Sequence, residues 1–168
     1  MNTHLSKKLK NGNDSHELDQ SLESFEHGEG AIVKDQLGNE YLNMSLNTET
    51  SPSNEDSTSG DLMDKARRFL ASLKAITDLY PVKVHAKGNR FNLFFHKKNP
   101  GSFREMKIYD DENAKWFYQS LLKEGVRFNS SPGGANCIAK EHTDKQLRLI
   151  IIAVQRALAF VYGYVDNM

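Results

Sequence analysis

A polar tract divides this chain into two parts that carry regular apolar patterns. Residues 51–60 read SPSNEDSTSG and offer nothing to a hydrophobic core. Residues 28–44 and 82–160, in contrast, have the alternating or helical spacing of apolar side chains typical of ordered structure. Residues 47–60 are therefore expected to form a flexible linker. Residues 1–23, which are polar with few aliphatic side chains, are expected to form a disordered tail.

Length and charge exclude several classes of protein. A chain of 168 residues has room for a single core. Its 22 Lys and Arg balance 22 Asp and Glu, so charge predicts binding neither to nucleic acid nor to a membrane. The N-terminal residues lack the apolar core of a secretory signal, and the longest apolar stretch, in residues 147–161, is too short to span a bilayer. With one cysteine, Cys137, an internal disulfide is excluded and a cytoplasmic location is expected.

Short apolar runs predict β-strands. Those at residues 31–33 and 41–44 flank a turn in which Gly38 can supply a positive φ, so residues 24–46 are expected to form an N-terminal β-hairpin segment. Residues 82–86 and 90–95 form a second pair around the turn at Gly88. Shorter strands are expected at residues 126–128 and 137–139. A loop is expected to run from Asn99 to Tyr109.

Three helices are predicted from apolar residues spaced three or four positions apart. The first, at residues 61–79, ends before Pro81. The second begins at Asp110 or Asp111 and stops at Gly125. The third begins with the capping-box spacing of Thr143 and Gln146. The apolar stripe of the third helix contains Leu147, Ile151, Val154, Leu158 and Val161. The expected fold class is α+β, a small antiparallel sheet with about three helices packed on one face, within residues 61–164.

Few residues indicate a catalytic or binding role, and each of them also has a purely structural interpretation. His142 precedes the N-cap of the last helix, where packing is about four times as probable as a catalytic role. Cys137 lies in an apolar strand, as a structural thiol would. The residues Ser130, Ser131, Gly133 and Gly134 either form an anion-binding loop or, more simply, a turn between strands. The histidines and Cys137 have no metal-ligand spacing, so no metal site is predicted.

Together these segments resemble the class III pyridoxal-phosphate aminotransferases, and most closely the glutamate-1-semialdehyde aminomutase branch. Residues 25–42 (FEHGEGAIVKDQLGNEYL) are similar to the N-terminal hairpin of that family, with Asn43 where an acid is usual. Residues 88–95 (GNRFNLFF) resemble the first strand of its C-terminal domain. Residues 121–126 (LLKEGV) and 141–144 (EHTD) resemble the segments before its last strand and final helix. The resemblance covers residues 25–46 and 62–158.

The resemblance implies a small domain without the cofactor domain. In the family a large domain between these parts supplies the Schiff-base lysine, the acid paired with the pyridinium nitrogen and the phosphate-binding turn. Residues 47–60 take its place here, so no catalytic or cofactor-binding residue is carried over, and no pyridoxal phosphate is expected on this chain alone. The Pro-Gly-Gly segment of the branch is not visible in residues 1–24. Its substrate-facing Phe-Glu falls at about Gly133 and Gly134.

Three functions remain open. The first is a non-catalytic small-domain relic that binds a protein partner, or a second copy of itself, through an apolar surface left uncovered. The second is an auxiliary subunit or fragment of a pyridoxal-phosphate-dependent aminotransferase or aminomutase acting on an amino acid or amino sugar. The third is a small-molecule or anion binder that uses the loop at residues 130–134.

Overall fold

The computed structural model describes residues 25–26, 31–45, 60–96, 109–131 and 134–163. The expected tail at residues 1–23, nearly all of the expected linker and the loop that begins at Asn99 lie outside these residues. The division of the chain into tail, hairpin, linker and domain therefore stays a prediction.

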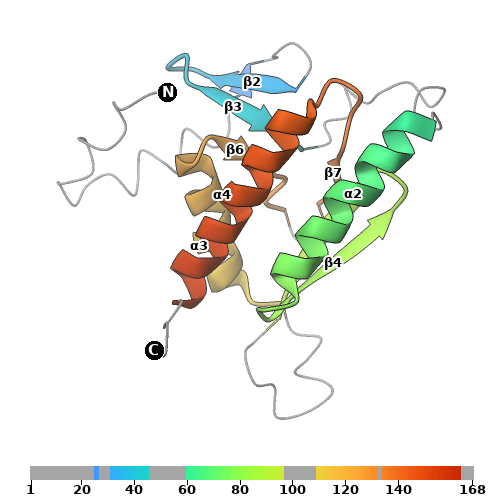
Figure 1. Ribbon diagram of the computed structural model, residues 1–168. Helices are drawn as coiled ribbons and strands as arrows, with labels where there is room; N and C mark the ends of the chain where they lie inside the picture. Colours follow the sequence, from blue (N-terminus) through green and yellow to red (C-terminus); the bar gives the residue numbers. More distant parts are fainter. Residues whose placement is uncertain (1–24, 27–30, 46–59, 97–108, 132–133, 164–168) are drawn as a thin grey trace.

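Strands and helices alternate along the described residues (Figure 1). The strands are β1 (Phe25–Glu26), β2 (Ile32–Asp35), β3 (Glu40–Asn43), β4 (Val82–Lys87), β5 (Arg90–Phe95), β6 (Val126–Arg127) and β7 (Asn136–Cys137). The helices are α2 (Gly60–Thr77), α3 (Asp111–Lys123) and α4 (Asp144–Tyr162). The α+β class and the three expected helices are confirmed. Strand β1 was not predicted, and α2 begins at Gly60, which the sequence had placed in the linker.

The described strands form two small sheets, where the sequence predicted one. The first has the order β1-β2-β3-β6 and the second the order β4-β5-β7. Pairing is antiparallel except between β3 and β6, which are parallel. The division arises because the N-terminal hairpin pairs with β6, and not with β4 or β5. A bridge between Ser45 and Asn136 still brings the end of the hairpin beside the second sheet.

Asp35 fixes the turn of the N-terminal hairpin. Its Oδ1 accepts hydrogen bonds from the backbone N–H groups of Leu37 and Asn39, each at 2.9 Å. Its Oδ2 accepts from Asn39 Nδ2 at 2.9 Å and from the Tyr41 hydroxyl at 3.0 Å. Burial alone would raise the pKa of Asp35, but these bonds to the charged form outweigh burial and lower it. Gly38 has a φ of 80°, the positive value that the turn was expected to need.

The predicted starts of α3 and α4 are confirmed. Asp110 caps α3 by accepting a hydrogen bond from the Asn113 N–H at 3.1 Å. Thr143 Oγ1 accepts from the Gln146 N–H at 3.1 Å, and Gln146 Oε1 accepts from the Thr143 N–H at 2.9 Å. The capping box predicted from the sequence is therefore present. Helix α2 ends at Thr77, two residues earlier than expected, because residues 78–80 form a tighter turn before Pro81.

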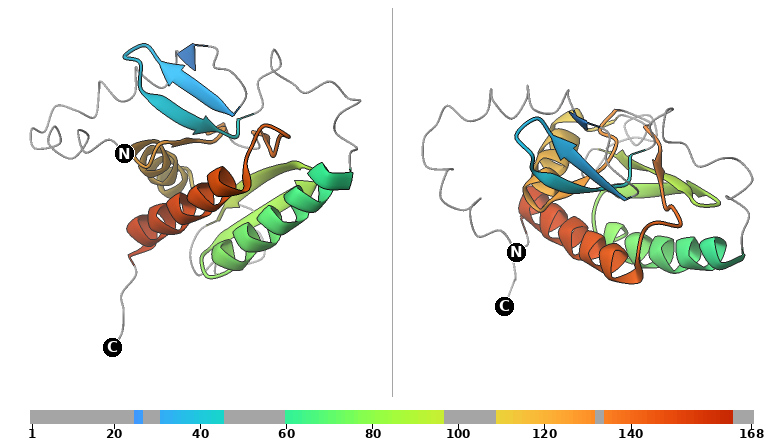
Figure 2. Two further views of the ribbon diagram at one scale, coloured as in Figure 1. Left: turned by 45° about the horizontal axis from the view of Figure 1, so that its top comes forward. Right: turned by 90° about the horizontal axis from the view of Figure 1, so that it is seen from above.

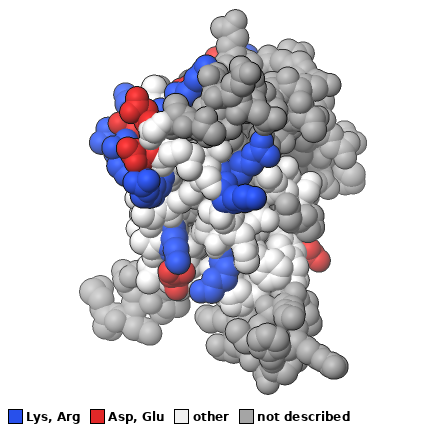
Figure 3. Space-filling model, turned by 90° about the vertical axis from the view of Figure 1, so that its right-hand side faces the viewer, with Lys and Arg blue, Asp and Glu red and all other residues white. Residues whose placement is uncertain are grey.

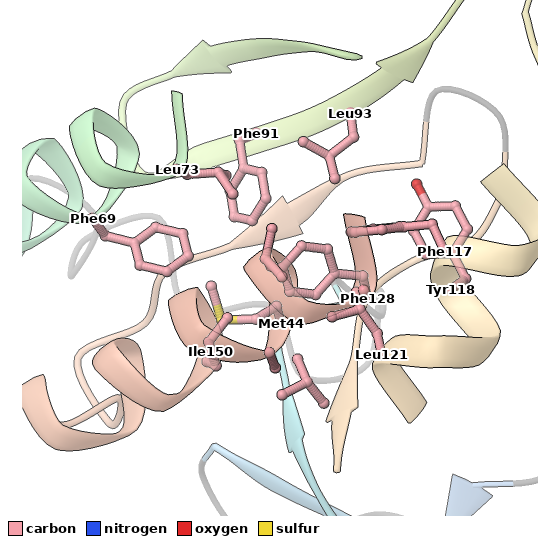
Figure 4. Close-up of a cluster of buried hydrophobic side chains, with 14 of the residues drawn as sticks. Met44, Phe69, Leu73, Phe91, Leu93, Phe117, Tyr118, Leu121, Phe128 and Ile150 are labelled. Atoms are coloured by element: carbon pink, nitrogen blue, oxygen red, sulfur yellow. The ribbon is translucent and has the colours of Figure 1, made fainter. Parts of the chain in front are cut away.

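One hydrophobic core joins the two sheets and the three helices. Helix α4 lies between α2 and α3, and α2 also contacts β4 (Figures 1 and 2). Phe91, Leu93 and Phe95 of β5 are all buried on one face, as predicted, and belong to the same cluster as the buried side chains of α4. Met44, at the end of the N-terminal hairpin, also lies in this cluster (Figure 4). The two patterned parts of the sequence therefore share one core.

The buried face of α4 differs from the predicted stripe. Ile151 and Val161 are only partly buried, whereas Ile150 is fully buried together with Ala153 and Ala157. The reason is that α4 contacts a helix on each side, so its buried face is wider than a single stripe. The two alanines provide short side chains on this wider buried face.

Candidate functional site

The candidate loop at residues 130–134 is described only in part. Gly133 lies outside the described residues, and Ser130 and Ser131 are exposed. Asn129 organises the described part, because its Oδ1 accepts a hydrogen bond from the Ser131 N–H at 3.0 Å. The Asn129 N–H donates in turn to Asn136 Oδ1 at 2.8 Å, where Asn136 is fully buried. These hydrogen bonds agree with a turn in the described part of the loop.

Gly134 has no room for a side chain. Its N–H donates a hydrogen bond to the Ser131 carbonyl at 2.7 Å. A Cβ at position 134 would collide with the Asn129 amide and would lie 2.8 Å from the Ser131 carbonyl oxygen. We therefore expect Gly134→Ala to lower the free energy of unfolding by about 1–3 kcal/mol, because the loop must shift. Ser131→Ala, whose side chain is exposed, should change it by less than about 0.5 kcal/mol. Urea denaturation of both variants checks this; equal stabilities would contradict it.

His142 is buried at the start of α4 and bridges two stretches of main chain. Its Nδ1 accepts a hydrogen bond from the Ala139 N–H at 2.9 Å, and its Nε2 lies 2.9 Å from the Asn43 carbonyl oxygen. An N–H group can only donate and a carbonyl oxygen can only accept, so the ring is neutral with its proton on Nε2. Burial lowers the pKa of His142, which agrees with this neutral state. Both ring nitrogens are occupied, which fits the packing interpretation.

Cys137 is a buried free thiol. Its Sγ accepts a hydrogen bond from Asn89 Nδ2 at 3.2 Å and lies 3.5 Å from the Ile138 carbonyl oxygen. Burial raises the pKa of this thiol, which disfavours the thiolate that a nucleophile requires. The structural interpretation of Cys137 therefore agrees with its surroundings.

Cys137 and His142 meet at the end of β3. The Met44 carbonyl accepts a hydrogen bond from the Cys137 N–H at 2.8 Å, and the Asn43 carbonyl faces His142. Lys65 of α2 reaches the same junction, where its Nζ donates to the His142 carbonyl at 2.8 Å. The candidate residues are thus brought together through main-chain groups and not through reactive side chains.

On the face shown in Figure 3, Lys and Arg side chains stand in small separate groups, some with acidic side chains beside them. Within the described residues there is no cluster of three or more His, Cys, Asp or Glu that could hold a metal ion. No helix in the described part of the chain is long and apolar enough to cross a bilayer.

A groove between α2 and α4 is the candidate binding feature that the sequence did not reveal. It has a volume of about 550 Å3 and combines apolar and charged side chains. The lining residues from α2 are Lys65, Arg68, Phe69 and Ser72, and those from α4 are Asp144, Leu147, Arg148, Ile151 and Ile152. Arg68 and Asp144 form an ion pair across it at 3.6 Å. Because the two helices are far apart in sequence, only their packing creates this groove.

The fold is that of part of a class III pyridoxal-phosphate aminotransferase. The structure is similar to that of a glutamate-1-semialdehyde aminomutase from Pseudomonas aeruginosa PAO1, with a TM-score of 0.51 at 13% sequence identity. This likeness covers 65% of the present chain and 24% of the aminomutase chain. The small α+β unit thus corresponds to a minor part of a much longer protein.

The sequence comparisons point to the same branch. The chain is 37% identical over 68 residues to glutamate-1-semialdehyde 2,1-aminomutase of Chlamydia pneumoniae, which is 40% of this chain and 16% of that protein. It is 29% identical over 97 residues to the enzyme of Nitrosomonas europaea, which is 56% of this chain and 22% of that protein. No protein-family model matches the chain. The resemblance inferred from the sequence is confirmed, and the chain spans less than a quarter of the length of these two relatives.

Proposed function

We propose that this chain is a non-catalytic small domain derived from a class III aminotransferase, and that it acts by binding another protein. The observation that carries the proposal is that the N-terminal and C-terminal parts of the chain share one hydrophobic core. Strand β3 of the N-terminal part pairs with β6 of the C-terminal part, and Met44 is buried among side chains of the C-terminal part. The parts that resemble the two ends of the family therefore pack together without the cofactor domain.

A non-catalytic role is supported by the state of the candidate reactive groups. The ring nitrogens of His142 both contact main-chain groups, and Cys137 is a buried thiol with a raised pKa. A general base must be able to reach the proton that it removes, and a nucleophile must be able to ionise. The resemblance also assigns the cofactor lysine to the domain whose place is taken by residues 47–60.

A binding role is supported by apolar side chains on the outer surface of the helices. Leu149, Ile152 and Phe160 of α4 are between 44% and 65% exposed, and Trp116 of α3 is 49% exposed. Exposed apolar side chains that gather on one surface favour association with another protein. This surface is where we expect a partner or a second copy to bind.

The alternative is an auxiliary subunit that completes an aminotransferase whose large domain is a separate chain. The fold likeness favours it, since a variant of the Pseudomonas aminomutase has been described in complex with PMP. On that hypothesis the loop at residues 130–134 would lie nearest the cofactor.

Mixing experiments separate the two functions. The chain is combined with a relative's cofactor domain from which both terminal parts have been removed, and transamination is measured. We expect no turnover above that of the cofactor domain alone. We also expect association of the chain to weaken by roughly tenfold or more when Leu149, Ile152 and Phe160 are all changed to Asp, because charged groups disfavour an apolar interface. Turnover that appears only in the mixture would establish the auxiliary subunit instead.

A further inference from the structure

The groove between α2 and α4 has an apolar floor and a basic rim. Its rim carries the three cationic side chains Lys65, Arg68 and Arg148 against one acidic side chain, Asp144. Lys65 donates its hydrogen bonds to neutral carbonyl groups, which do not neutralise its positive charge. A groove of this kind favours a segment that is both acidic and amphipathic, because acids match the rim and apolar groups match the floor.

The chain itself contains a segment with this composition. Residues 14–23 read DSHELDQSLE, with four acidic side chains, no lysine or arginine, and two leucines, Leu18 and Leu22, spaced four residues apart. Of the two other internal stretches of more than ten residues outside the described part, 97–108 carry more basic than acidic side chains, and 46–59 have a single large apolar side chain, Leu46. Residues 14–23 thus combine both properties that the groove requires.

Leu22 of this segment cannot reach the groove of the same copy. Residues 14–23 lead to Phe25, which pairs with Asp35 at the turn end of the hairpin. That turn end lies beside the end of α3 at Gly125, whereas the groove lies between α4 and α2, on the other side of α4 (Figure 1). Leu22 is three residues from Phe25, a span of at most about 11 Å. A helix with its side chains is about 10–12 Å across, so Leu22 cannot pass α4 and reach the groove floor.

We propose that the groove of one copy binds residues 14–23 of a second copy of the chain. This rests on the proposed binding function and names its partner. Each copy then provides one acidic segment and one basic groove, so the exchange closes into a symmetric dimer. Leu18 and Leu22 lie against Ile151 and Ile152, and the acidic side chains pair with Arg68 and Arg148 at the rim.

The test is sedimentation equilibrium of the full chain at about 50 mM and about 500 mM salt, since screening weakens exposed ion pairs. The unaltered chain is expected to dimerise, with a dimer Kd at least tenfold higher at high salt. Ile152→Asp should raise the dimer Kd roughly tenfold or more. The control Leu79→Asp should leave it unchanged, because Leu79 is also an exposed apolar side chain (75%) but does not line the groove.

Two further variant sets locate the occupant. Arg68→Glu should weaken the dimer, whereas Arg67→Glu, on the neighbouring residue outside the groove, should not. Leu18→Asp with Leu22→Asp should weaken it without changing the circular dichroism, and a synthetic peptide of residues 13–24 should compete with it. A chain that is monomeric at low salt, or a dimer insensitive to Ile152→Asp and to the two leucine changes, would overturn the proposal. A dimer sensitive to Leu149→Asp alone would also overturn it, yet would leave the proposed binding function in place.

Discussion

Replacing Ile150 by alanine should lower the free energy of unfolding by about 2–5 kcal/mol. Ile150 is fully buried in the cluster where α4 meets the other helices and strand β5 (Figure 4). Removing its outer carbons loses the transfer free energy of those atoms and leaves a cavity that the surrounding side chains fill only in part. A loss of this size is a large fraction of the stability of a small domain.

The adjacent Ile151 provides the matched control. It is only partly buried and lines the groove between α2 and α4. Ile151→Ala should cost less than half as much as Ile150→Ala, because solvent already reaches its side chain. Both values come from urea or thermal denaturation followed by circular dichroism. Equal losses, or a larger loss for Ile151→Ala, would mean that α4 is rotated from the position described.

Replacing His142 by alanine should cost about 2–5 kcal/mol. The ring joins the Asn43 carbonyl at the end of β3 to the Ala139 N–H before α4, and the change leaves both partly buried groups without this partner. Each such group costs about 1–3 kcal/mol when it is unpaired. His85→Ala is the control, since the His85 side chain is exposed and should contribute less than about 0.5 kcal/mol. A similarly small effect of His142→Ala would contradict the bridging role.

The same residue makes stability depend on pH. Burial lowers the pKa of His142 in the folded chain below its ordinary value of about 6.5, so the unfolded chain binds more protons below that pH. Stability is therefore fully present above about pH 6.5, decreases as the pH falls through that value, and levels off once the folded His142 is also protonated. The lowered pKa of Asp35 acts only near and below pH 4. His142→Ala should flatten the pH dependence of the free energy of unfolding between about pH 7.5 and 5. If the slope is unchanged in this variant, another group causes the pH dependence.

Local signals in the sequence determined much of the fold. Gly38 marked the hairpin turn, and Thr143 with Gln146 marked the start of α4, because these features depend on residues within one turn of each other. The alternation in residues 90–95 likewise predicted the buried face of β5. Each of these predictions needed only neighbouring residues.

Contacts between distant residues were not predictable in this way. The parallel pairing of β3 with β6 joins segments about 80 residues apart, and no turn signal specifies it. The bond from Lys65 to the His142 carbonyl spans 77 residues, and the groove between α2 and α4 depends on how the helices pack. Asn129 and Asn136 could have been noticed, since asparagines beside a Gly-Gly pair are typical of tight loops. Their partners could not have been named from the sequence.

Titration of the purified chain with pyridoxal phosphate tests the non-catalytic role most directly. The cofactor must bind a positioned lysine whose amine is unprotonated, next to groups that hold its phosphate. We predict no absorption band of lysine-bound cofactor, and no single lysine labelled after borohydride reduction, while a full-length relative treated in parallel shows both. A stable band that borohydride fixes on one specific lysine of this chain would contradict the account.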